Sequence, residues 1–364
     1  MSTDTGHVVT TEGRRSPETL GLTLPHEHVF IDFTGNETPL PASGVERRVA
    51  REPVSMDTLW YVRRNPMRHE DNRRLGDPET ARAELGRFVR AGGRTLVDVT
   101  PKHVGGDPQR VSGIARELGL HCVHGTAIYT APFHPDRIER LSVDDIRAEF
   151  VSDVRSGIDG TDVRAGVIGE IGLSGHIHDA EERVLRGAAR AASETGAPLA
   201  VHPPGRTPHS QRDRTYPSSR WGLEILDVVE AEGLPPERVA LCHMDRTVYE
   251  DRSYQRQLAD RGAYLEYDLW GHELHLDQYD DAYMPDTQRL EFTTSLIADG
   301  YAEQLLFSHD VCNKVQYTAY GGYGYTHVPR NVRSMIQGRG VDASTVEQIC
   351  TQNPQSWLTF ASPR

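Results

Sequence analysis

Short apolar runs rich in β-branched residues alternate along the chain with longer stretches in which apolar residues recur every three or four positions. The short runs are typical of buried strands, and the longer stretches are typical of helices that pack on one face. The pattern predicts eight strands, at Leu22–Phe33, Thr95–Thr100, Cys122–Ala127, Ala165–Glu170, Leu199–His202, Val239–His243, Ala263–Asp268 and Leu305–Asp310. Because helical stretches separate most of these strands, the expected fold class is α/β, a (β/α)8 TIM barrel.

Two of the helices between the strands have clear boundaries. The first is expected over Asp179–Thr195, where apolar residues share one face. Asp179 and Glu182 resemble a capping box at its start, and Gly196 marks its end. The second helix is expected near Ser219–Glu232.

A doubly wound open sheet is the competing topology, but no glycine-rich phosphate-binding motif follows an early strand. The glycine-rich segment at 321–324 comes after the last strand and does not open a first helix. We therefore expect a single domain over residues 1–364, with the barrel at about 20–360. A segment rich in proline, arginine and asparagine, at about 34–77, is expected to form an insertion after the first strand.

The composition excludes several classes of partner. The 364 residues include 40 Lys+Arg and 53 Asp+Glu, and the resulting net charge of −13 argues against nucleic acid or an anionic membrane surface. No window approaches the ~18 apolar residues of a membrane span, and the N-terminus does not resemble a secretory signal. Four cysteines in so long a chain do not suggest a disulfide framework. We expect a cytoplasmic globular protein.

Five of the predicted strands carry side chains that can bind metal at their C-terminal ends. His26 and His28 share a face of the first strand, because alternate residues of a strand point the same way. The other four strands end in single candidates, Glu170, His202, His243 and Asp310. The C-terminal ends of barrel strands converge on one mouth, so four imidazoles and two carboxylates are expected to meet there. A lone histidine at a strand end is more often structural, but this combination indicates a metal centre.

The donor set also indicates the kind of metal and the number of ions. Imidazole with carboxylate suits Zn²⁺, or Mn²⁺, Co²⁺ or Fe²⁺, rather than Ca²⁺. Six ligands exceed the needs of one catalytic zinc that keeps a position open, so we predict two divalent ions, preferably Zn²⁺, that share a bridging carboxylate. Cys242 alternates with His243 and is expected to face the helices. His309 alternates with Asp310 and is expected to face away from the mouth as a structural residue.

Around these residues the sequence resembles the phosphotriesterase-related proteins, in the phosphotriesterase branch of the amidohydrolase superfamily. The resemblance covers about residues 20–360 and rests on Leu24-Pro25-His26-Glu27-His28, Ile168-Gly169-Glu170-Ile171-Gly172, His202-Pro203-Pro204-Gly205-Arg206, His243-Met244-Asp245-Arg246-Thr247, Tyr264-Leu265-Glu266-Tyr267-Asp268-Leu269, Ser308-His309-Asp310, Tyr320-Gly321-Gly322-Tyr323-Gly324-Tyr325 and Asn353-Pro354. It implies a (β/α)8 barrel with a binuclear metal centre, and it also suggests a homodimer. In such a centre His26, His28 and Asp310 would hold the buried ion, and His202 and His243 the more exposed one.

The chain departs from phosphotriesterases proper at the bridge between the ions. Those enzymes carry a carboxylated lysine at the end of strand 4, whereas Glu170 stands there in this sequence. Neither lysine of the chain is near that position, because Lys102 follows strand 2 and Lys314 follows strand 8. The phosphotriesterase-related proteins resemble this chain in using glutamate, which offers the same two oxygens without carbon dioxide.

A second ring of residues is expected to bind the substrate. Arg206 and Arg246 lie on loops at the expected mouth, where a guanidinium group would bind a carboxylate, sulfonate or phosphate of the substrate. The alternative for Arg246 is an ion pair with Asp245 or another loop acid. Three aromatic residues are expected either to form a wall of the pocket or to pack in the core: Tyr129, Tyr267 and Trp270.

The expected activity is hydrolysis by a hydroxide that bridges the two ions, with Asp310 as the group that accepts the proton of the water. Glu170 and the two loop arginines favour a small, anionic acyl substrate, either an N-acyl amide or a lactone or carboxylic ester. An organophosphate triester is the alternative substrate. A mononuclear deaminase is disfavoured, because Pro203-Pro204-Gly205 follows His202 and Glu170 is present. The alternative of another class is a catalytically inactive barrel that only binds a ligand, and the six intact ligands disfavour it.

Overall fold

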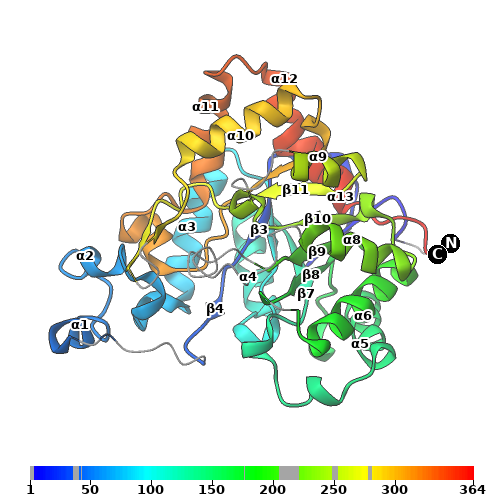
Figure 1. Cartoon of the computed structure of the whole chain (residues 1–364), viewed down its shortest axis with the longest axis horizontal. Helices are drawn as coiled ribbons and strands as arrows, with labels where there is room; N and C mark the ends of the chain where they lie inside the picture. The colour runs from blue at the N-terminus through cyan, green and yellow to red at the C-terminus, as the bar shows by residue number, and fades with distance from the viewer. Residues whose placement is uncertain are drawn as a thin grey trace.

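Eight parallel strands form the centre of the molecule, and helices surround them (Figure 1). The computed structural model describes residues 4–35, 41, 43–175, 177–204, 221–247, 253–277 and 281–364. The strands of the central sheet are β3 (Thr23–Glu27), β6 (Thr95–Asp98), β7 (His121–Thr126), β8 (Val167–Gly172), β9 (Leu199–His202), β10 (Val239–Leu241), β11 (Tyr264–Tyr267) and β14 (Leu305–Phe307). Each strand overlaps one of the eight predicted strands, and the predicted (β/α)8 barrel is confirmed.

The sheet follows the order of the chain, from β3 at one edge to β14 at the other, with parallel pairing between all neighbours. The two edge strands lie against each other, and buried side chains join them. Ser308 Oγ donates to the carbonyl of His26 at 2.8 Å, and the carboxylate of Glu27 accepts from the backbone N–H groups of His309 and Val311, both at 2.9 Å. The seam of the barrel is therefore fixed by hydrogen bonds beside the predicted ligands of both edges.

Two apolar layers lie on the two sides of the strands. Mainly small side chains, together with one leucine, fill the inside of the barrel: Val97, Val99, Val123, Val167, Ala200, Ala240, Cys242 and Leu306. Larger apolar side chains of the alternate strand positions, such as Leu96 and Ile168, pack outward against the helices. This alternation is what the period of two in the sequence predicts for a barrel strand.

The helices are α1 (Gly44–Val49), α2 (Leu59–Val62), α3 (Pro78–Arg90), α4 (Pro108–Leu118), α5 (Val143–Arg155), α6 (Asp179–Thr195), α8 (Trp221–Ala231), α9 (Ser253–Asp260), α10 (Asp286–Ala298), α11 (Arg333–Gln337), α12 (Ala343–Glu347) and α13 (Asn353–Leu358). Helix α6 spans the predicted residues, but its cap lies one residue earlier than predicted. The backbone N–H of His178, not of Asp179, donates to the carboxylate of Glu181 at 3.0 Å. Helix α8 begins its described part at Trp221, and Ser219 lies outside the described residues.

The first predicted strand is wrong in its extent, because the chain leaves the barrel after Glu27. It forms a second short strand, β4 (Ile31–Asp32), which pairs antiparallel with β5 (Arg74–Leu75) instead of joining the barrel. The backbone N–H of Val29 is bound by the Asp98 carboxylate at 3.2 Å, and this side-chain partner replaces a ladder bond. The segment between β4 and α3 carries α1 and α2 away from the barrel, where an insertion was predicted (Figure 1).

The two ends of the described chain lie next to each other (Figure 1). The backbone N–H of Gly6 donates to the carbonyl of Phe360, and the N–H of Phe360 donates to the carbonyl of His7, both at 2.9 Å. A short hairpin of β1 (Val8–Thr10) and β2 (Gly13–Arg15) follows this contact. In the described residues we find no helix whose length and hydropathy would let it cross a bilayer.

Candidate metal centre

The six predicted ligands come together at the C-terminal ends of five strands. His26 lies in β3 and His28 directly after it, Glu170 lies in β8, and His202 ends β9. His243 and Asp310 follow β10 and β14, and both have a left-handed backbone, with φ of 55° and 50°. All six side chains are buried.

Glu170 lies in the middle of this group. Its Oε2 is 2.9 Å from His202 Nδ1, 3.6 Å from His243 Nε2 and 3.7 Å from His26 Nε2. Its Oε1 is 3.5 Å from His28 Nε2. One carboxylate thus faces four imidazoles, which is the arrangement that a bridging ligand requires.

Asp310 completes the group on the side of the first strand. Its Oδ1 lies 3.1 Å from His28 Nε2 and 3.9 Å from His26 Nε2. Burial alone would raise the pKa of Asp310, but the contacts with the neighbouring His28 and His243 lower it below its ordinary value. The carboxylate is therefore ionised at neutral pH and can act as a ligand or as a proton acceptor.

Three of the imidazoles are held by hydrogen bonds on the side that faces away from the centre. His26 Nδ1 lies 3.1 Å from Glu266 Oε2, and His243 Nδ1 lies 2.8 Å from Asp268 Oδ1. His28 Nδ1 lies 2.9 Å from Thr100 Oγ1, whose own hydrogen donates to an Asp98 oxygen at 2.6 Å. Each Nδ1 is therefore the donor, and each Nε2 keeps a lone pair that points into the centre. This tautomer is the one that a metal ligand needs.

The environment fits a pair of cations. His26 Nε2 is buried and has no hydrogen-bond partner among the described residues, which is unfavourable unless a further group binds it. Two donor sets, His26–His28–Asp310 and His26–Glu170–His243, each have their ligand atoms within 4.8 Å of one another. Burial and the neighbouring His243 lower the pKa of His202 to about 4, so this imidazole is neutral at pH 7 and free to coordinate. Nitrogen and oxygen donors of this kind suit Zn²⁺ and related ions.

Cys242 lies inside the barrel, so the prediction that it faces the helices is wrong. Its Sγ belongs to a third group of potential donors with His26, Glu266 and Asp268, within 4.8 Å of one another. The reason is the left-handed backbone of His243, which interrupts the alternation of the strand and lets two consecutive residues face inward. Burial raises the pKa of the Cys242 thiol, which therefore stays protonated. His309 faces away from the centre, as predicted, and its Nδ1 lies 2.6 Å from Glu27 Oε1.

The carboxylates behind the ligands, Glu266 and Asp268, were not predicted as part of the site. Asp268 accepts both the backbone N–H of His243, at 3.0 Å, and its ring Nδ1–H. Burial raises the pKa of Asp268 to about 7 although His26 attracts its charge, and cations at the centre would lower it again. The signal was present in the sequence, because Glu266 and Asp268 occupy alternate positions of one strand and must share a face.

The predicted aromatic wall is only partly present. The Tyr129 ring lies 5.2 Å from the His202 ring and packs with Phe133 at 5.6 Å. Tyr267 points outward, where its hydroxyl donates to Gln255 at 2.6 Å, because it lies between the inward-facing Glu266 and Asp268. Trp270 packs against Phe307 in the core at 5.5 Å. Tyr267 and Trp270 therefore pack in the core, which is the second of the two alternatives that the sequence left open, and they do not line the pocket.

Of the two predicted arginines, only Arg246 lies in the described part of the chain. Arg206 lies outside the described residues. Arg246 is partly buried near the Asp310 and Tyr129 side chains, and no carboxylate of the described chain lies within 4.0 Å of its guanidinium group. The expected alternative, an ion pair with Asp245, is absent from the described residues, because Asp245 is bound by Arg289 at 2.7 Å.

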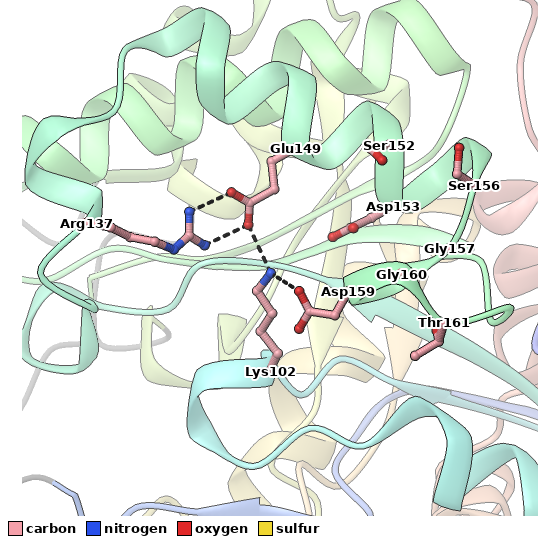
Figure 2. Close-up of a pocket in the computed structure, with 10 residues that line it drawn as sticks. All are labelled: Lys102, Arg137, Glu149, Ser152, Asp153, Ser156, Gly157, Asp159, Gly160 and Thr161. Atoms are coloured by element: carbon pink, nitrogen blue, oxygen red, sulfur yellow. Dashed lines mark hydrogen bonds and ion pairs between the residues drawn. The ribbon is translucent and has the colours of Figure 1, made fainter.

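Neither lysine reaches the centre, as the sequence predicts. Figure 2 shows Lys102 in a hollow beside α5, where its Nζ lies 3.1 Å from Glu149 Oε1 and 2.5 Å from Asp159 Oδ1. Burial opposes the charge of Lys102, but these two carboxylates outweigh it and raise the pKa of the amine. Lys314 pairs with Asp71 in the insertion. Neither lysine therefore competes with Glu170 for the predicted bridging position.

Comparison with known proteins identifies the chain's relatives. A model of the Phosphotriesterase family matches residues 6–358. The N-acetyltaurine hydrolase of Danio rerio is 34% identical over 363 residues, which cover 99% of this chain and 100% of the relative. The crystal structure of a resiniferatoxin-binding protein from Rhodobacter sphaeroides aligns with a TM-score of 0.92 and 35% identity, over 98% of this chain and 97% of the other.

A solved lactonase from Listeria monocytogenes is a more distant neighbour, with a TM-score of 0.75 and 25% identity over 98% of this chain and 100% of the other. The phosphotriesterase family depends on binuclear metal centres, and the described residues hold a donor set of that kind in one buried cluster. The chain belongs to the phosphotriesterase family and is a hydrolase of that family.

Proposed function

We propose that the protein is a metal-dependent amidase that cleaves the N-acyl bond of a small amine with an anionic tail, such as N-acetyltaurine. The observation that carries this proposal is the partly buried Arg246 guanidinium, which lies near Asp310 and has no carboxylate partner within 4.0 Å among the described residues. A cation that is partly withdrawn from water and has no partner is unfavourable, and an anionic substrate would satisfy it. The family relatives named N-acetyltaurine hydrolases, which match the chain over almost its whole length, support the same substrate class.

The proposed ligand set is the predicted one, with two divalent ions, preferably Zn²⁺. Glu170 would bridge them, His26, His28 and Asp310 would hold one, and His202 and His243 would hold the other. When bound, such ions polarise the scissile carbonyl group and activate a water molecule. Glu266, Asp268 and Thr100 keep three of the imidazoles in the tautomer that leaves Nε2 free to coordinate.

The chain's own residues would perform the remaining steps. Arg246 would bind the anionic tail of the substrate, and Tyr129, which packs edge-on to His202, would form the wall beside the acyl group. Asp310, ionised because His28 and His243 lower its pKa, would accept the proton of the attacking water at a carboxylate oxygen. The same proton would then pass to the leaving nitrogen, so that a carboxylic acid and a free amine are released. Arg206 stays a candidate for a second contact with the anionic tail.

A hydrolysis screen of the metal-loaded protein tests this proposal. It compares N-acetyltaurine, its carboxylate analogue, a neutral N-acetyl amine of the same length, a lactone and an aryl phosphotriester. We expect kcat/KM to be highest for the two anionic amides, by at least about tenfold over the neutral amide, because a charge-assisted hydrogen bond is lost with the charge. Equal kcat/KM values for the anionic and neutral amides would contradict the proposal.

Lactone hydrolysis is the second candidate, because the solved lactonase from Listeria monocytogenes aligns with the whole barrel. Faster cleavage of the lactone than of every amide in the same screen would favour it, and faster cleavage of the phosphotriester would favour the organophosphate alternative. We also propose a cytoplasmic homodimer. All four cysteines are free thiols, which suits a reducing compartment, and light scattering would give the number of chains.

A further inference from the structure

Arg289 lies in the first turn of α10, fully buried between two carboxylates. Its Nε donates to Asp245 Oδ1 and its Nη1 donates to Asp286 Oδ1, both at 2.7 Å. Its Nη2 donates to the carbonyl of His272 at 3.4 Å. The exposed fraction of Arg289 is 0%, so these contacts replace its whole hydration shell. The ion pair is therefore a fixed part of the interior and not a surface contact.

The Asp245 carboxylate connects Arg289 to the loop that follows β10. Its second oxygen, Oδ2, accepts the backbone N–H of Asp268 at 3.0 Å, and Asp268 in turn holds the ring of His243. Both oxygens of Asp245 are thus occupied on the side away from the centre. The next residue of the loop is Arg246, whose guanidinium group has no carboxylate within 4.0 Å among the described residues.

Without Arg289, the Asp245 carboxylate would compete with the substrate for the guanidinium group of Arg246. Asp245 and Arg246 are neighbours in the chain, both are largely removed from water, and an unpaired carboxylate in such surroundings attracts the nearest guanidinium group. Asp245 is itself buried, and a buried carboxylate depends on a neighbouring cation for its charge. Arg289 supplies that cation from another element of the fold, 44 residues away in the chain.

We propose that Arg289 is a positioning residue for substrate recognition: it holds Asp245 and thereby leaves the Arg246 guanidinium group free to bind the anionic tail of the substrate. This inference rests on the proposed function, in which Arg246 binds that tail. Without Arg289, Asp245 would turn toward Arg246 and neutralise it. The loss would fall on the binding of anionic substrates, because neutral substrates make no use of the Arg246 charge.

The test combines Arg289→Met, Arg289→Lys, Arg246→Met and the double variant Arg289→Met/Asp245→Asn, with kcat and KM measured for N-acetyltaurine and for the neutral amide of the same length. Arg289→Met is expected to raise the KM for N-acetyltaurine at least about tenfold and the KM for the neutral amide less than about threefold. Arg289→Lys keeps the charge and is expected to retain most of the preference for N-acetyltaurine over the neutral amide. The double variant removes the competing charge of Asp245 and is expected to restore the preference.

The matched control is Asp286→Asn, which weakens the other ion pair of Arg289 but leaves Asp245 bound. It also alters the two other contacts of Asp286, with the backbone N–H of Gly271 and with His327 Nε2. It is expected to leave the ratio of the two KM values unchanged. Circular dichroism and melting curves identify a variant that does not fold, and in that case the Arg289→Lys and double variants decide.

Equal rises in KM for both substrates in Arg289→Met, or no recovery of the preference in the double variant, would overturn the inference and leave Arg289 as a support for α10. The inference also predicts that Arg289→Met acts only through Arg246. It would fail if adding Arg289→Met to the Arg246→Met variant lowered the preference for N-acetyltaurine over the neutral amide as much as it does in the wild type. If the wild-type protein shows no preference for the anionic amide, the proposed function fails as well. If the wild type shows the preference and Arg246→Met abolishes it, the proposed function stands whatever Arg289→Met does.

Discussion

Asp268→Asn is expected to weaken the binding of the ion held by His243. The Asp268 carboxylate accepts two hydrogen bonds from His243, at 3.0 Å from its backbone N–H and at 2.8 Å from its ring Nδ1–H. An asparagine can accept only one of them, because its amide nitrogen is a donor and would face a second N–H. A hydrogen bond to a charged group contributes ~1.5–3 kcal/mol, which corresponds to roughly a 10- to 100-fold loss of metal affinity.

The assay is a competition titration of the metal-free protein with a chromophoric zinc chelator at pH 7, which gives a dissociation constant for each ion. The matched control is Thr100→Val, which removes the hydroxyl group that holds His28 Nδ1 and is expected to weaken the other ion instead. If Asp268→Asn bound both ions within about threefold of the wild type, His243 would not be a ligand whose orientation Asp268 sets, and the assignment of this half of the centre would be refuted.

Three further predictions concern the same centre. Asp310→Asn is expected to lower kcat by ~10²–10⁴-fold with most of the metal retained, because an amide cannot accept the proton of the water; retention of both the ions and more than about a tenth of kcat would limit Asp310 to a ligand role. Recovery of activity when metal is added back to the metal-free protein is expected to be independent of bicarbonate, because Lys102 and Lys314 are both ion-paired elsewhere. A strong bicarbonate requirement in the activity assay would mean that a carboxylated lysine, and not Glu170, bridges the ions. Cys242→Ala is expected to keep the full metal content on elemental analysis, because its thiol stays protonated, and loss of an ion would make the sulfur a ligand.

The barrel and its six donors could be predicted from the sequence because both depend on local periodicity. A period of two places alternate side chains inside the barrel, and the parallel connections bring all C-terminal strand ends to one mouth. The same rule also predicts that Glu266 and Asp268 face inward and Tyr267 outward. Its position near a strand end left Tyr267 with two alternatives, the pocket wall or the core, and this alternation favours the core.

Other features depend on contacts that no local pattern encodes. Cys242 and His243 both face inward because the backbone of His243 is left-handed, and the residue type of His243 does not predict this. The first strand ends early because Asp98 binds the backbone of Val29 from a neighbouring strand. The freedom of Arg246 depends on Arg289, which reaches Asp245 from a distant helix. Such long-range pairs could not be inferred from a single sequence.

The central claim is that six side chains hold two ions that share Glu170, and elemental analysis of the purified protein and of Glu170→Gln tests it most directly. The wild type is expected to contain close to two divalent ions per chain, preferably zinc. The substituted side chain offers one weak amide oxygen in place of a charged carboxylate, so the variant is expected to hold clearly fewer ions while its circular dichroism spectrum stays unchanged. Two firmly bound ions in the Glu170→Gln protein, or a fully active wild type with one ion or none, would contradict the account.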